Sequence, residues 1–404
     1  MKILTLNAGS NSLKFKIVAE SGSTEEFGYS LVSGVYDNIG KNGSIFKLLD
    51  GKRPTHKEEI EIRDHGHATE LLLDWINHGN TKDRGIDGLR DVERIGHRVV
   101  HGADRFSGPT KITDGVIRQI EDLSDLAPLH NESALAVIRA AQSKIGSRIP
   151  MIAVFDTVFH QSIPDEAALY PLPVDLAKQH KIRRYGFHGI SHKYLTHRYA
   201  QIESCPVHDV NIITLHLEGG SSAAAIRNGC SVDTSMGFTP LEGLMMGTRC
   251  GDIDPAIVTY LMRKEKLETA DAENLLNKQC GLIGISGSSA DTRELIKHLD
   301  DERALLALKM FSYRVRKYIG AYLAALGGAE AIVFGGGIAE NTPLVREWIC
   351  EGLAWFGAIL DRARNNQTID REGAITIPDA RVPVWVIPTQ EGLMMAREVA
   401  SWGG

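Results

Sequence analysis

Cysteine and long apolar runs are both scarce in this sequence. The five cysteines among 404 residues are widely scattered and form no Cys-x-x-Cys pair, which argues against a disulfide framework or a thiolate zinc site. No segment approaches the roughly 18 consecutive apolar residues that span a bilayer, and the chain opens with a strand-like segment rather than a signal peptide. We therefore expect a cytoplasmic protein with reduced thiols.

A net basic charge and the common nucleotide-binding motifs are also missing. The formal net charge is −6 with both signs interspersed, so no basic stripe indicates a nucleic-acid partner. Neither Gly-x4-Gly-Lys-Ser/Thr nor a Gly-x-Gly-x-x-Gly turn after the first strand is present. With 43% hydrophobic and 24% charged residues the composition is typical of a globular protein of two or three domains. Any anionic ligand must then be bound by a few local cations.

Two stretches of the chain share one plan of strand, Gly/Ser turn and strand. They are MKILTLNAGSNSLKFKIV, residues 1–18, and VNIITLHLEGGSSAAAIRNG, residues 210–229. This repetition predicts two similar α/β halves, each with a glycine-serine hairpin, rather than a short-period solenoid.

Later segments add further strands and helices. The apolar run 150–156 is expected to be a buried strand, and apolar residues at steps of three and four predict a helix over 301–326 that ends at Gly327 and Gly328. Residues 331–341 indicate a strand, a glycine turn and a helix start, and residues 382–402 a strand and a helix. We expect the last helix to pack on the first domain.

The glycine-serine turns and two arginines are candidate anion-binding groups. Successive backbone N–H groups in a tight turn can bind phosphate, and Lys14 adds a cation to the first turn. Arg98 lies among histidines and valines, and Arg249 lies in a glycine-rich loop. Taken singly, such a hairpin is more often structural and such an arginine more often solvated or ion-paired.

Histidines gather in three loops, as His97 and His101, as His130, and as His188 and His192. The His188–His192 spacing suggests zinc, but neither an intervening Glu nor a third ligand accompanies it. A loop histidine between aromatic and glycine residues more often donates a hydrogen bond to a developing negative oxygen, or is satisfied by the backbone.

Three acidic residues stand out. Asp156 follows an apolar strand, where α/β folds place their ligand contacts, and Glu391 follows the strand near the C-terminus. Mg²⁺ prefers one or two such carboxylates together with substrate phosphates. Asp291 can bind a ligand or act as an ordinary acid at a helix N-terminus, and the sequence favours neither.

Eight motifs together identify a resemblance that covers essentially the whole chain. They are NAGSNSLKF, HRVVHG, APLHN, FDTVFHQSIP, RRYGFHG, SVDTSMGFTPLEGLMMGTRCGDIDP, GISGSSADTRE and FGGGIAEN. In this order they resemble the acetate kinase (acetokinase) family, and the stretch 231–255 is the most specific.

The resemblance implies the α/β fold of the sugar kinase, actin and chaperone ATPase superfamily, with two duplicated actin-like, ribonuclease H-like domains around a cleft. Residues 1–156, completed by the helix at 389–404, would form the first domain. Residues 157–388 would form the second, which carries the nucleotide and the dimer contacts. The implied activity is reversible conversion of acetate to acetyl phosphate by a homodimer, with ATP and Mg²⁺, or Mn²⁺ in its place.

The resemblance also implies a role for each matching residue. Asn7 and Glu391 would hold the metal. Asp156 would be the catalytic acid, Arg98 would bind the substrate carboxylate, and Arg249 and His188 would stabilise the transferring phosphoryl group with His130 nearby. The methyl pocket would be Val100, Leu129, Phe187 and Pro240. The phosphates and nucleotide would contact Ser10, Ser12, Lys14, His216, Leu217, Glu218, Gly219, Gly220, Asp291, Thr292, Arg293, Gly336, Gly337, Ile338, Ala339, Glu340 and Asn341.

Several positions depart from the family pattern. Asn11 interrupts the Ser turn, Glu218-Gly219-Gly220 replaces Gly-Asn-Gly, Cys250 replaces Ser, Gly335 replaces Thr and Ala339 replaces Gly. Most of these lie in turns that would contact phosphate or adenosine, so they bear on the choice of phosphoryl donor. Three alternatives stay open: a propionate kinase, a non-catalytic nucleotide or acyl-phosphate sensor, and a sugar or polyol kinase.

Overall fold

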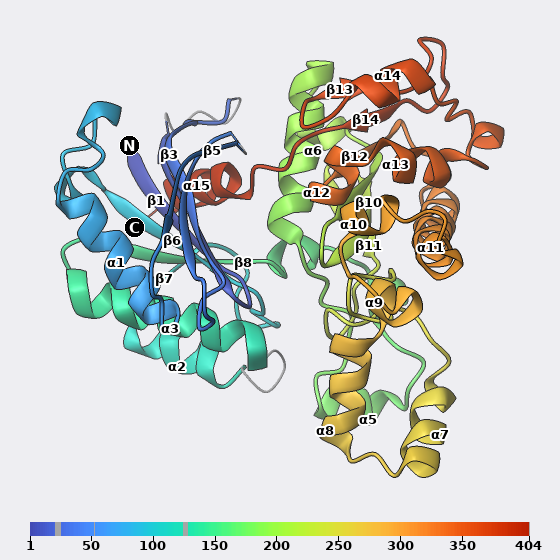
Figure 1. Ribbon diagram of the computed structural model, residues 1–404, viewed down its shortest axis with the longest axis horizontal. Coiled ribbons are helices and arrows are strands. Elements are labelled where there is room, and N and C mark those ends of the chain that lie inside the picture. Colours follow the sequence, from blue (N-terminus) through green and yellow to red (C-terminus); the bar gives the residue numbers. More distant parts are fainter. Residues whose placement is uncertain (21–25, 52, 124–127, 404) are drawn as a thin grey trace. The chain divides into compact units, whose positions relative to one another are not determined.

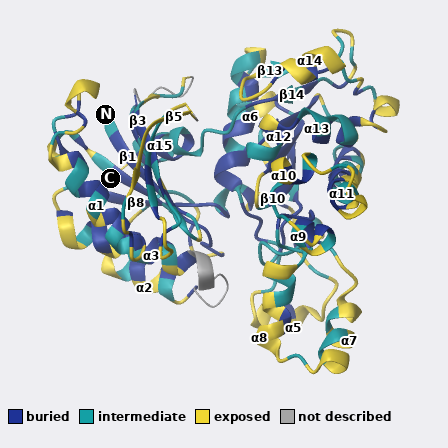
Figure 2. Cartoon of the chain, viewed as in Figure 1, coloured by how far each residue is buried: buried dark blue, intermediate teal, exposed yellow. Residues whose placement is uncertain are grey.

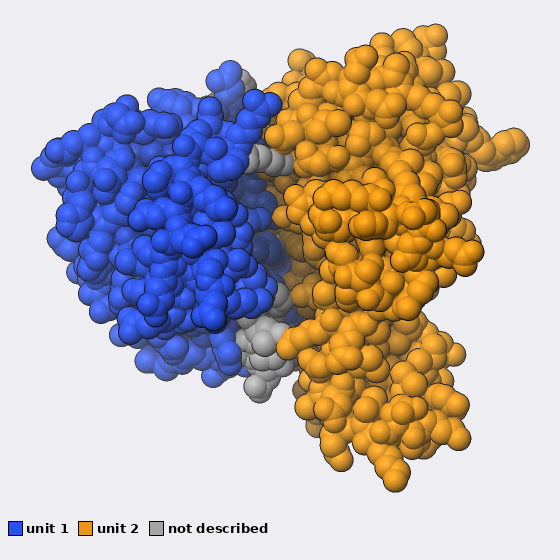
Figure 3. Space-filling view, in the orientation of Figure 1, with its two compact units in different colours: residues 1–158, 390–404 blue, residues 159–389 orange. Residues whose placement is uncertain are grey.

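The structure, a computed structural model, describes residues 1–20, 26–51, 53–123 and 128–403, with the backbone alone at 128–130. The chain divides into two units, residues 1–158 with 390–404 and residues 159–389 (Figure 3). Each unit contains one mixed β-sheet with helices packed on it (Figure 1). Within the described residues, every helix is too short or too polar to cross a lipid bilayer.

The first unit is built on an eight-stranded sheet of order β5-β4-β3-β2-β1-β6-β8-β7. The strands are β1 (Lys2–Ala8), β2 (Ser12–Ala19), β3 (Tyr29–Asp37), β4 (Ile45–Asp50), β5 (Arg53–Glu59), β6 (Arg94–Val99), β7 (Thr110–Lys111) and β8 (Met151–Phe155). β1 and β2 form the expected hairpin, and β6 and β8 run parallel to β1. The fully buried run of β8 confirms the strand predicted over 150–156.

Helices cover both faces of this sheet. They are α1 (His65–Asn77), α2 (Asp114–Glu121), α3 (Pro128–Ile145) and α15 (Glu391–Ser401), with 3₁₀ turns at Lys82–Arg84 and Leu89–Asp91. Trp75 of α1 packs against Phe15 of β2 with ring centroids 6.2 Å apart, whereas Gly392 of α15 lies against Lys16, the next residue of β2. Because side chains alternate along a strand, α1 and α15 cover opposite faces.

The second unit is built on a six-stranded sheet of order β11-β10-β9-β12-β14-β13. The strands are β9 (Ile212–Leu217), β10 (Ser221–Arg227), β11 (Cys230–Thr234), β12 (Ala331–Gly335), β13 (Gly373–Ala374) and β14 (Val384–Val386). β9 and β10 form the second expected hairpin, and β12 and β14 run parallel to β9.

The two sheets therefore share one topology. The order β3-β2-β1-β6-β8 in the first unit and β11-β10-β9-β12-β14 in the second both comprise three antiparallel strands followed by two that run parallel to the first. This confirms the prediction of two similar α/β halves, each with a hairpin that precedes its parallel strands.

The second unit carries most of the helices. They are α4 (Asp165–Ala168), α5 (Val174–Gln179), α6 (Gly189–Glu203), α7 (Pro255–Glu265), α8 (Thr269–Asn274), α9 (Gly281–Ser286), α10 (Thr292–Ile296), α11 (Glu302–Leu326), α12 (Gly337–Asn341), α13 (Pro343–Cys350) and α14 (Arg362–Gln367). Shorter turns lie at Val158–His160, Val207–Asp209, Leu275–Gln279 and Ala354–Phe356.

Helix α11 confirms the strongest helix prediction. Asp301 caps its start by accepting from the backbone N–H of Arg303 and Ala304, and Gly327 ends it in the left-handed conformation at φ 74°. Its buried stripe, which includes Leu308, Phe311 and Val315, packs with the apolar side chains of β9, β10 and β12. The opposite face of this sheet lies under α6 and is polar.

Three buried histidines make the stability of the protein depend on pH. Burial lowers the pKa of His97 to about 3, that of His160 to about 4 and that of His192 well below its ordinary value. In the unfolded chain each would titrate near 6.5, so below that pH the unfolded state binds more protons than the folded state. The contribution of these three groups to the free energy of unfolding is therefore nearly constant well above pH 6.5. As the pH drops through 6.5 it falls, with a slope of up to about 4 kcal/mol per pH unit down to about pH 4.

Urea unfolding at pH 7, 6 and 5 measures this slope. His97→Leu should remove about a third of it, because one of the three titrating groups is gone. Both ring nitrogens of His97 lack a hydrogen-bond partner among the described residues, so this variant leaves no buried polar group behind. An unchanged slope in His97→Leu would contradict the assignment.

Candidate active-site residues in each unit

Four predicted site residues of the first unit form one hydrogen-bonded chain. Asn7 Nδ2 donates to Glu391 Oε2 at 3.0 Å, and Arg98 Nη1 donates to Asn7 Oδ1 at 2.9 Å. Arg98 also donates to Asp156 Oδ2, through Nε at 3.0 Å and through Nη2. The structure thus joins the residues that the sequence assigned to metal, substrate carboxylate and catalysis.

The topology of the sheet explains this convergence. β1, β6 and β8 are adjacent and parallel, so Asn7, Arg98 and Asp156 all lie at the carboxyl edge, where α/β sheets bind ligands. Glu391 reaches the same edge because it is the first residue of α15. The Asp156 side chain is fully buried while that of Arg98 is 14% exposed. Of this ion pair, only the Arg98 side chain is therefore in contact with solvent.

Lys14 lies beside Asn7 across the β1–β2 hairpin. The two residues are cross-strand partners, and Lys14 is exposed. The turn before it is closed by a backbone hydrogen bond of 2.8 Å from Gly9 N–H to the Ser12 carbonyl, with Ser10 exposed and Ser12 half-buried. The predicted phosphate-binding side chains of this turn are therefore at the surface.

The loop after β6 carries Val100, which is 5% exposed. His101 N–H donates to Asn131 Oδ1 and Asn131 Nδ2 donates to the His101 carbonyl, which fixes the first turns of α3 against this loop. Leu129 and His130 belong to that start of α3, but their side chains lie outside the described residues, so their predicted roles stay predictions.

In the second unit, His188 and Arg249 both lie against the Gly219–Gly220 turn. A Cβ atom placed on Gly220 would be 3.4 Å from His188 Nε2 and 3.5 Å from Arg249 Nη1. Gly247 N–H donates to the Gly219 carbonyl at 3.1 Å, so the loop that carries Arg249 is fixed to this turn. Glycine at residue 220 leaves room for a ligand atom between the two side chains.

Arg249 is well placed to bind an anion. Burial lowers the pKa of its guanidinium, which means that the cation lacks part of the stabilisation that water would give. Its Nη1 contacts the Met246 sulfur at 3.7 Å, a weak acceptor. A phosphoryl oxygen beside this guanidinium would stabilise its charge far better than the Met246 sulfur does.

The backbone conformation and a side-chain hydrogen bond together fix the position of His188. It lies at the N-cap of α6 in the left-handed conformation, φ 57°, and its Nδ1 is 2.9 Å from Ser222 Oγ. Gly186, two residues before His188, also has positive φ. A Cβ there would lie 2.6 Å from atoms of His160 and Thr234, so residue 186 must be glycine. The ring of His188 lies 4.3 Å from that of His216.

The next residues predicted to contact the nucleotide differ in their exposure. Glu218 is about half exposed, with its carboxylate 3.6 Å from His216 Nε2 and its Cγ 3.9 Å from a Cβ placed on Gly337. His216, Leu217, Ala339 and Glu340 have buried side chains, and Glu340 Oε1 accepts from the Gly336 and Thr389 backbone N–H groups. These four therefore shape the turns rather than expose side chains to a ligand.

Gly336 brings the turn 336–341 directly against β9. Its φ is 86°, and a Cβ would lie 2.6 Å from the backbone N and O of Leu217. The turn continues into α12, which contains Gly337, Ile338 and Asn341. Gly336 thus places this turn beside the Glu218–Gly220 loop.

Asp291 caps the short helix α10. It accepts from the Arg293 backbone N–H at 2.8 Å and forms an ion pair with the Arg293 side chain, which lowers the pKa of the Asp291 carboxyl. Thr292 is buried beneath it. Ala290, the residue before Asp291, lies next to Gly247, so α10 begins near the Arg249 loop. The helix-capping role of Asp291 is present, and a ligand role stays a prediction.

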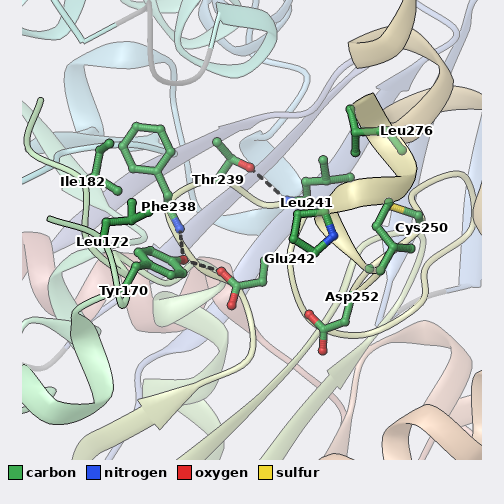
Figure 4. A pocket seen from close by; sticks show the side chains of 14 residues that line it. Tyr170, Leu172, Ile182, Phe238, Thr239, Leu241, Glu242, Cys250, Asp252 and Leu276 are labelled. Carbon is green, nitrogen blue, oxygen red and sulfur yellow. Dashed lines mark hydrogen bonds between the residues drawn. The ribbon is translucent and has the colours of Figure 1, made fainter. Parts of the chain in front are cut away.

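The residues predicted to form the methyl pocket are divided between the two units, and their common pocket stays a prediction. Val100 and Leu129 belong to the first, whereas Phe187, 1% exposed, and Pro240, half-buried, belong to the second. Pro240 lies in a loop that lines a separate cavity of about 570 Å³ (Figure 4). Tyr170, Phe238 and Glu242 form its hydrogen-bonded wall, and Cys250, which follows Arg249, also lines it.

The sequence did not reveal a layer of buried polar side chains, including Ser191 and Ser222, that contacts His188 and His216. We call it the polar layer. Ser222 bonds His188, and Ser191 Oγ is 2.7 Å from His216 Nδ1. The signal was present in β9, where polar Thr214 and His216 alternate with apolar residues in a strand that is buried throughout. Buried polar groups on one strand face require partners, which α6 and β10 supply.

The chain is similar to known acetate kinases over its whole length. The model of the acetokinase family matches residues 2–397. The acetate kinase of Chloroherpeton thalassium is 48% identical over 409 residues, with 98% of each chain covered, and that of Solibacter usitatus is 47% identical, with 98% of this chain and 97% of the other covered.

Solved structures give the same result. The acetate kinase of Porphyromonas gingivalis superimposes with a TM-score of 0.88 at 39% identity, covering 98% of both chains. A propionate kinase from Francisella tularensis superimposes with a TM-score of 0.87 at 37% identity, again covering 98% of both. Sequence and fold thus agree across both units, and the chain belongs to the acetokinase family.

Proposed function

We propose that this chain is a phosphotransferase that reversibly converts ATP and acetate to ADP and acetyl phosphate by direct in-line transfer. Membership of the acetokinase family supports the reaction. The observation that carries the proposal is the position of His188 and Arg249 against the Gly219–Gly220 turn, where a phosphoryl group would meet a hydrogen-bond donor and a cation.

Arg98 is the proposed site for the acetate carboxylate. Two unit charges of the same sign about 4 Å apart repel by roughly 4 kcal/mol at an effective dielectric near 20, so a carboxylate cannot approach a triphosphate without cations. The bonds of Arg98 to Asp156 and Asn7 hold its guanidinium plane in one orientation. An oriented guanidinium binds a carboxylate through two parallel hydrogen bonds.

Asp156 is proposed to orient Arg98 rather than to remove a proton. Acetate is already ionised at neutral pH, so its attack on phosphorus requires no general base. The Asp156 carboxylate is fully buried and accepts two hydrogen bonds from Arg98. A sugar kinase would instead need this acid to deprotonate a hydroxyl group, so in that case Asp156→Asn would remove a basic limb from the pH profile of kcat.

Asn7 and Glu391 are proposed to hold Mg²⁺. A carboxylate and an amide oxygen are donors that Mg²⁺ accepts, with water and phosphate completing its shell. In this structure Asn7 presents Nδ2 to Glu391 and Oδ1 to Arg98, so Asn7 would exchange its bond to Arg98 for the ion. When bound, the ion would neutralise phosphate charge. Its identity as Mg²⁺ rather than Mn²⁺ is part of the proposal.

The acceptor is proposed to be acetate rather than propionate. One methylene is worth only about 1 to 3 kcal/mol of discrimination, so the pocket residues favour the smaller acid only weakly. Val100, which is branched at Cβ and buried, is the side chain that would limit the length of the acyl group.

A panel of donors and acceptors on the purified protein tests this proposal. Acetyl phosphate formation should require ATP, acetate and a divalent cation, and propionate should react with a lower kcat/KM. Pyrophosphate serves as the alternative donor because Glu218, Gly335 and Ala339 alter the nucleotide turns. No product with either donor, together with retained nucleotide binding, would favour a sensor over an enzyme.

Glu218 should weaken the binding of nucleotide in the absence of metal. Its half-exposed carboxylate borders the Gly219–Gly220 turn, where it would repel the β-phosphate of ADP. Glu218→Gln should therefore tighten the binding of metal-free ADP about fivefold, a modest factor because solvent screens the charge. Isothermal titration with and without Mg²⁺ measures this, and weaker binding by the variant would show that Glu218 helps to hold the nucleotide.

The protein is proposed to act as a homodimer in the cytoplasm, where its substrates occur. Helix α7 has no buried residue (Figure 2). Its Ile257 and Tyr260, three residues apart on one side of the helix, are 44% and 51% exposed. Exposed apolar side chains that share a helix face are typical of a subunit interface.

Ile257→Glu combined with Tyr260→Glu should convert a dimer into a monomer. Two charges in an apolar interface would each remain without a partner after burial. Light scattering coupled to size-exclusion chromatography measures the mass of wild type and variant. Leu306→Glu, which alters an equally exposed leucine on α11, is the matched control and should leave the mass unchanged. A variant that remains dimeric would place the interface elsewhere.

A further inference from the structure

A chain of three hydrogen bonds lies behind His188. Its Nδ1 is 2.9 Å from Ser222 Oγ, Ser222 Oγ is 2.8 Å from His192 Nε2, and His192 Nδ1 is 2.8 Å from Thr214 Oγ1. Ser222, His192 and Thr214 have no exposed surface. The chain runs from the half-buried His188 into the polar face of β9 and β10 beneath α6.

The protons of this chain can be arranged in only three ways. Each hydroxyl has one proton and two lone pairs, and each neutral imidazole has one N–H and one bare nitrogen. Burial keeps His192 neutral, since it lowers the pKa of this residue well below its ordinary value. For a neutral His188 the protons run from Thr214 toward His188, or from His188 toward Thr214, or both imidazoles donate to Ser222 Oγ, which can accept twice.

The hydroxyl protons of Thr214 and Ser222 decide between these arrangements. If the protons run toward His188, the Thr214 hydroxyl donates to His192 Nδ1 and the Ser222 hydroxyl to His188 Nδ1. If they run the other way, the Thr214 proton needs another acceptor, and the described residues offer Thr214 Oγ1 no hydrogen bond besides that with His192. If both imidazoles donate to Ser222, the Ser222 proton needs another acceptor, and the described residues offer Ser222 Oγ no hydrogen bond besides those with the two histidines. Burial of an unsatisfied donor lowers the population of a state by a factor of about 5 to 150. The direction from Thr214 to His188 is therefore the stable one.

We infer that Ser222, His192 and Thr214 are positioning residues that fix His188 in one tautomer, with Nδ1 bare and the proton on Nε2. His188 Nε2 is the atom that faces the Gly219–Gly220 turn, 3.4 Å from a Cβ placed on Gly220. The N–H of a neutral ring is thereby aimed at the position where a phosphoryl oxygen would lie. This inference rests on the proposed function for the role of His188.

The same chain opposes protonation of His188. An imidazolium at residue 188 would have to donate through Nδ1 as well, so either the Ser222 proton or the Thr214 proton would lose its acceptor. Arg249 and the ring of His216 lie close to His188, and the Glu218 carboxylate lies beyond His216. The cation at this site is then Arg249, while His188 supplies a directed neutral donor.

Nitrogen NMR of the full-length protein with ¹⁵N-labelled histidine tests the inference. The signals of His188 are those that vanish from the spectrum of His188→Gln. In wild type the Nδ1 signal should have the shift of a bare imidazole nitrogen and the Nε2 signal that of an N–H. In Ser222→Ala the two signals should move toward each other, because both tautomers become populated. A protonated Nδ1 in wild type would overturn the inference.

Matched variants separate positioning from a loss of folding. Ser231→Ala removes the same kind of contact from another buried histidine, His160, whose Nδ1 is 2.8 Å from Ser231 Oγ. This control should leave the His188 tautomer and kcat unchanged. Ser222→Ala should lower kcat about tenfold at an unchanged KM for acetate, and His192→Gln, which keeps a donor toward Ser222, should retain more activity than His192→Leu.

The outcomes also distinguish this inference from the proposed function. The NMR signals report the tautomer even in a protein that forms no acetyl phosphate, so absence of the reaction would leave the tautomer result standing. Equal losses of kcat in Ser222→Ala and Ser231→Ala, with an unchanged His188 spectrum, would overturn the positioning role.

Discussion

Arg98→Ala is expected to raise the KM for acetate by at least about 100-fold, while the KM for ATP changes by less than about threefold. The proposed contact is a pair of charge-assisted hydrogen bonds to the acetate carboxylate, each worth about 1.5 to 3 kcal/mol. Steady-state rates over a grid of acetate and ATP concentrations measure both constants. A similar rise in both would contradict the assignment of Arg98 to the acyl substrate.

The same substitution should also destabilise the protein, because Asp156 is fully buried and Arg98 is its ion-pair partner. Removal of one partner from such a pair costs about 3 to 5 kcal/mol. The double variant Arg98→Ala/Asp156→Asn should recover most of the free energy of unfolding without recovering acetate binding. Arg98→Lys keeps the charge but lacks the planar, two-pronged donor, so it should restore stability more than acetate affinity.

Part of the first-unit cluster could be found from position in the chain. Asp156 follows the strand at 150–156, which its apolar run identified. Asn7 lies near the end of the first strand, but its selection came from the family resemblance. The direct bonds from Arg98 to both were not predictable, since they depend on β6 lying between β1 and β8. Strand order within a sheet is set by long-range packing that no local pattern records.

The polar layer of the second unit was hidden for a different reason. Ser222 lies in a run of small residues, and His192 on α6 could equally have been a structural histidine satisfied by the backbone. Only the register that places Ala224 opposite Thr214, and Ser222 opposite His216, puts the hydroxyls on one face beneath α6. A one-residue shift of β10 would have turned Ser222 to the apolar face.

The turns assigned to the nucleotide are turns in the structure, and their contact with a nucleotide stays a prediction, but sequence matching could not separate backbone roles from side-chain roles. Glu340 resembles a ligand-binding acid, yet its carboxylate is buried and bonds the backbone at Gly336 and Thr389. Burial, which depends on the packing of β12 and α12, decides between these roles, and a motif alone does not report it.

Arg249→Ala is expected to lower kcat by about 10³-fold or more, with the KM values for acetate and ATP changed only a few-fold. An arginine that stabilises charge on a transferring phosphoryl group is worth about 10³ to 10⁵ in rate, because that charge is largest in the transition state. The position of its Nη1, 3.5 Å from a Cβ placed on Gly220, is suited to this role. Rates at saturating acetate and MgATP measure the effect.

Two comparisons show whether the loss arises from the guanidinium itself. Arg249→Lys should remain far below wild type, since a single ammonium does not reproduce the planar donor. Guanidinium ion added to Arg249→Ala should restore part of kcat, because truncation leaves a cavity beside Met246 that the ion can enter. Arg227→Ala, a surface arginine bonded only to the Ala325 carbonyl among the described contacts, should keep full activity. If Arg249→Ala instead raised the KM for ATP at unchanged kcat, Arg249 would bind the ground-state nucleotide, and His188 would be left as the second unit's principal group acting on the transition state.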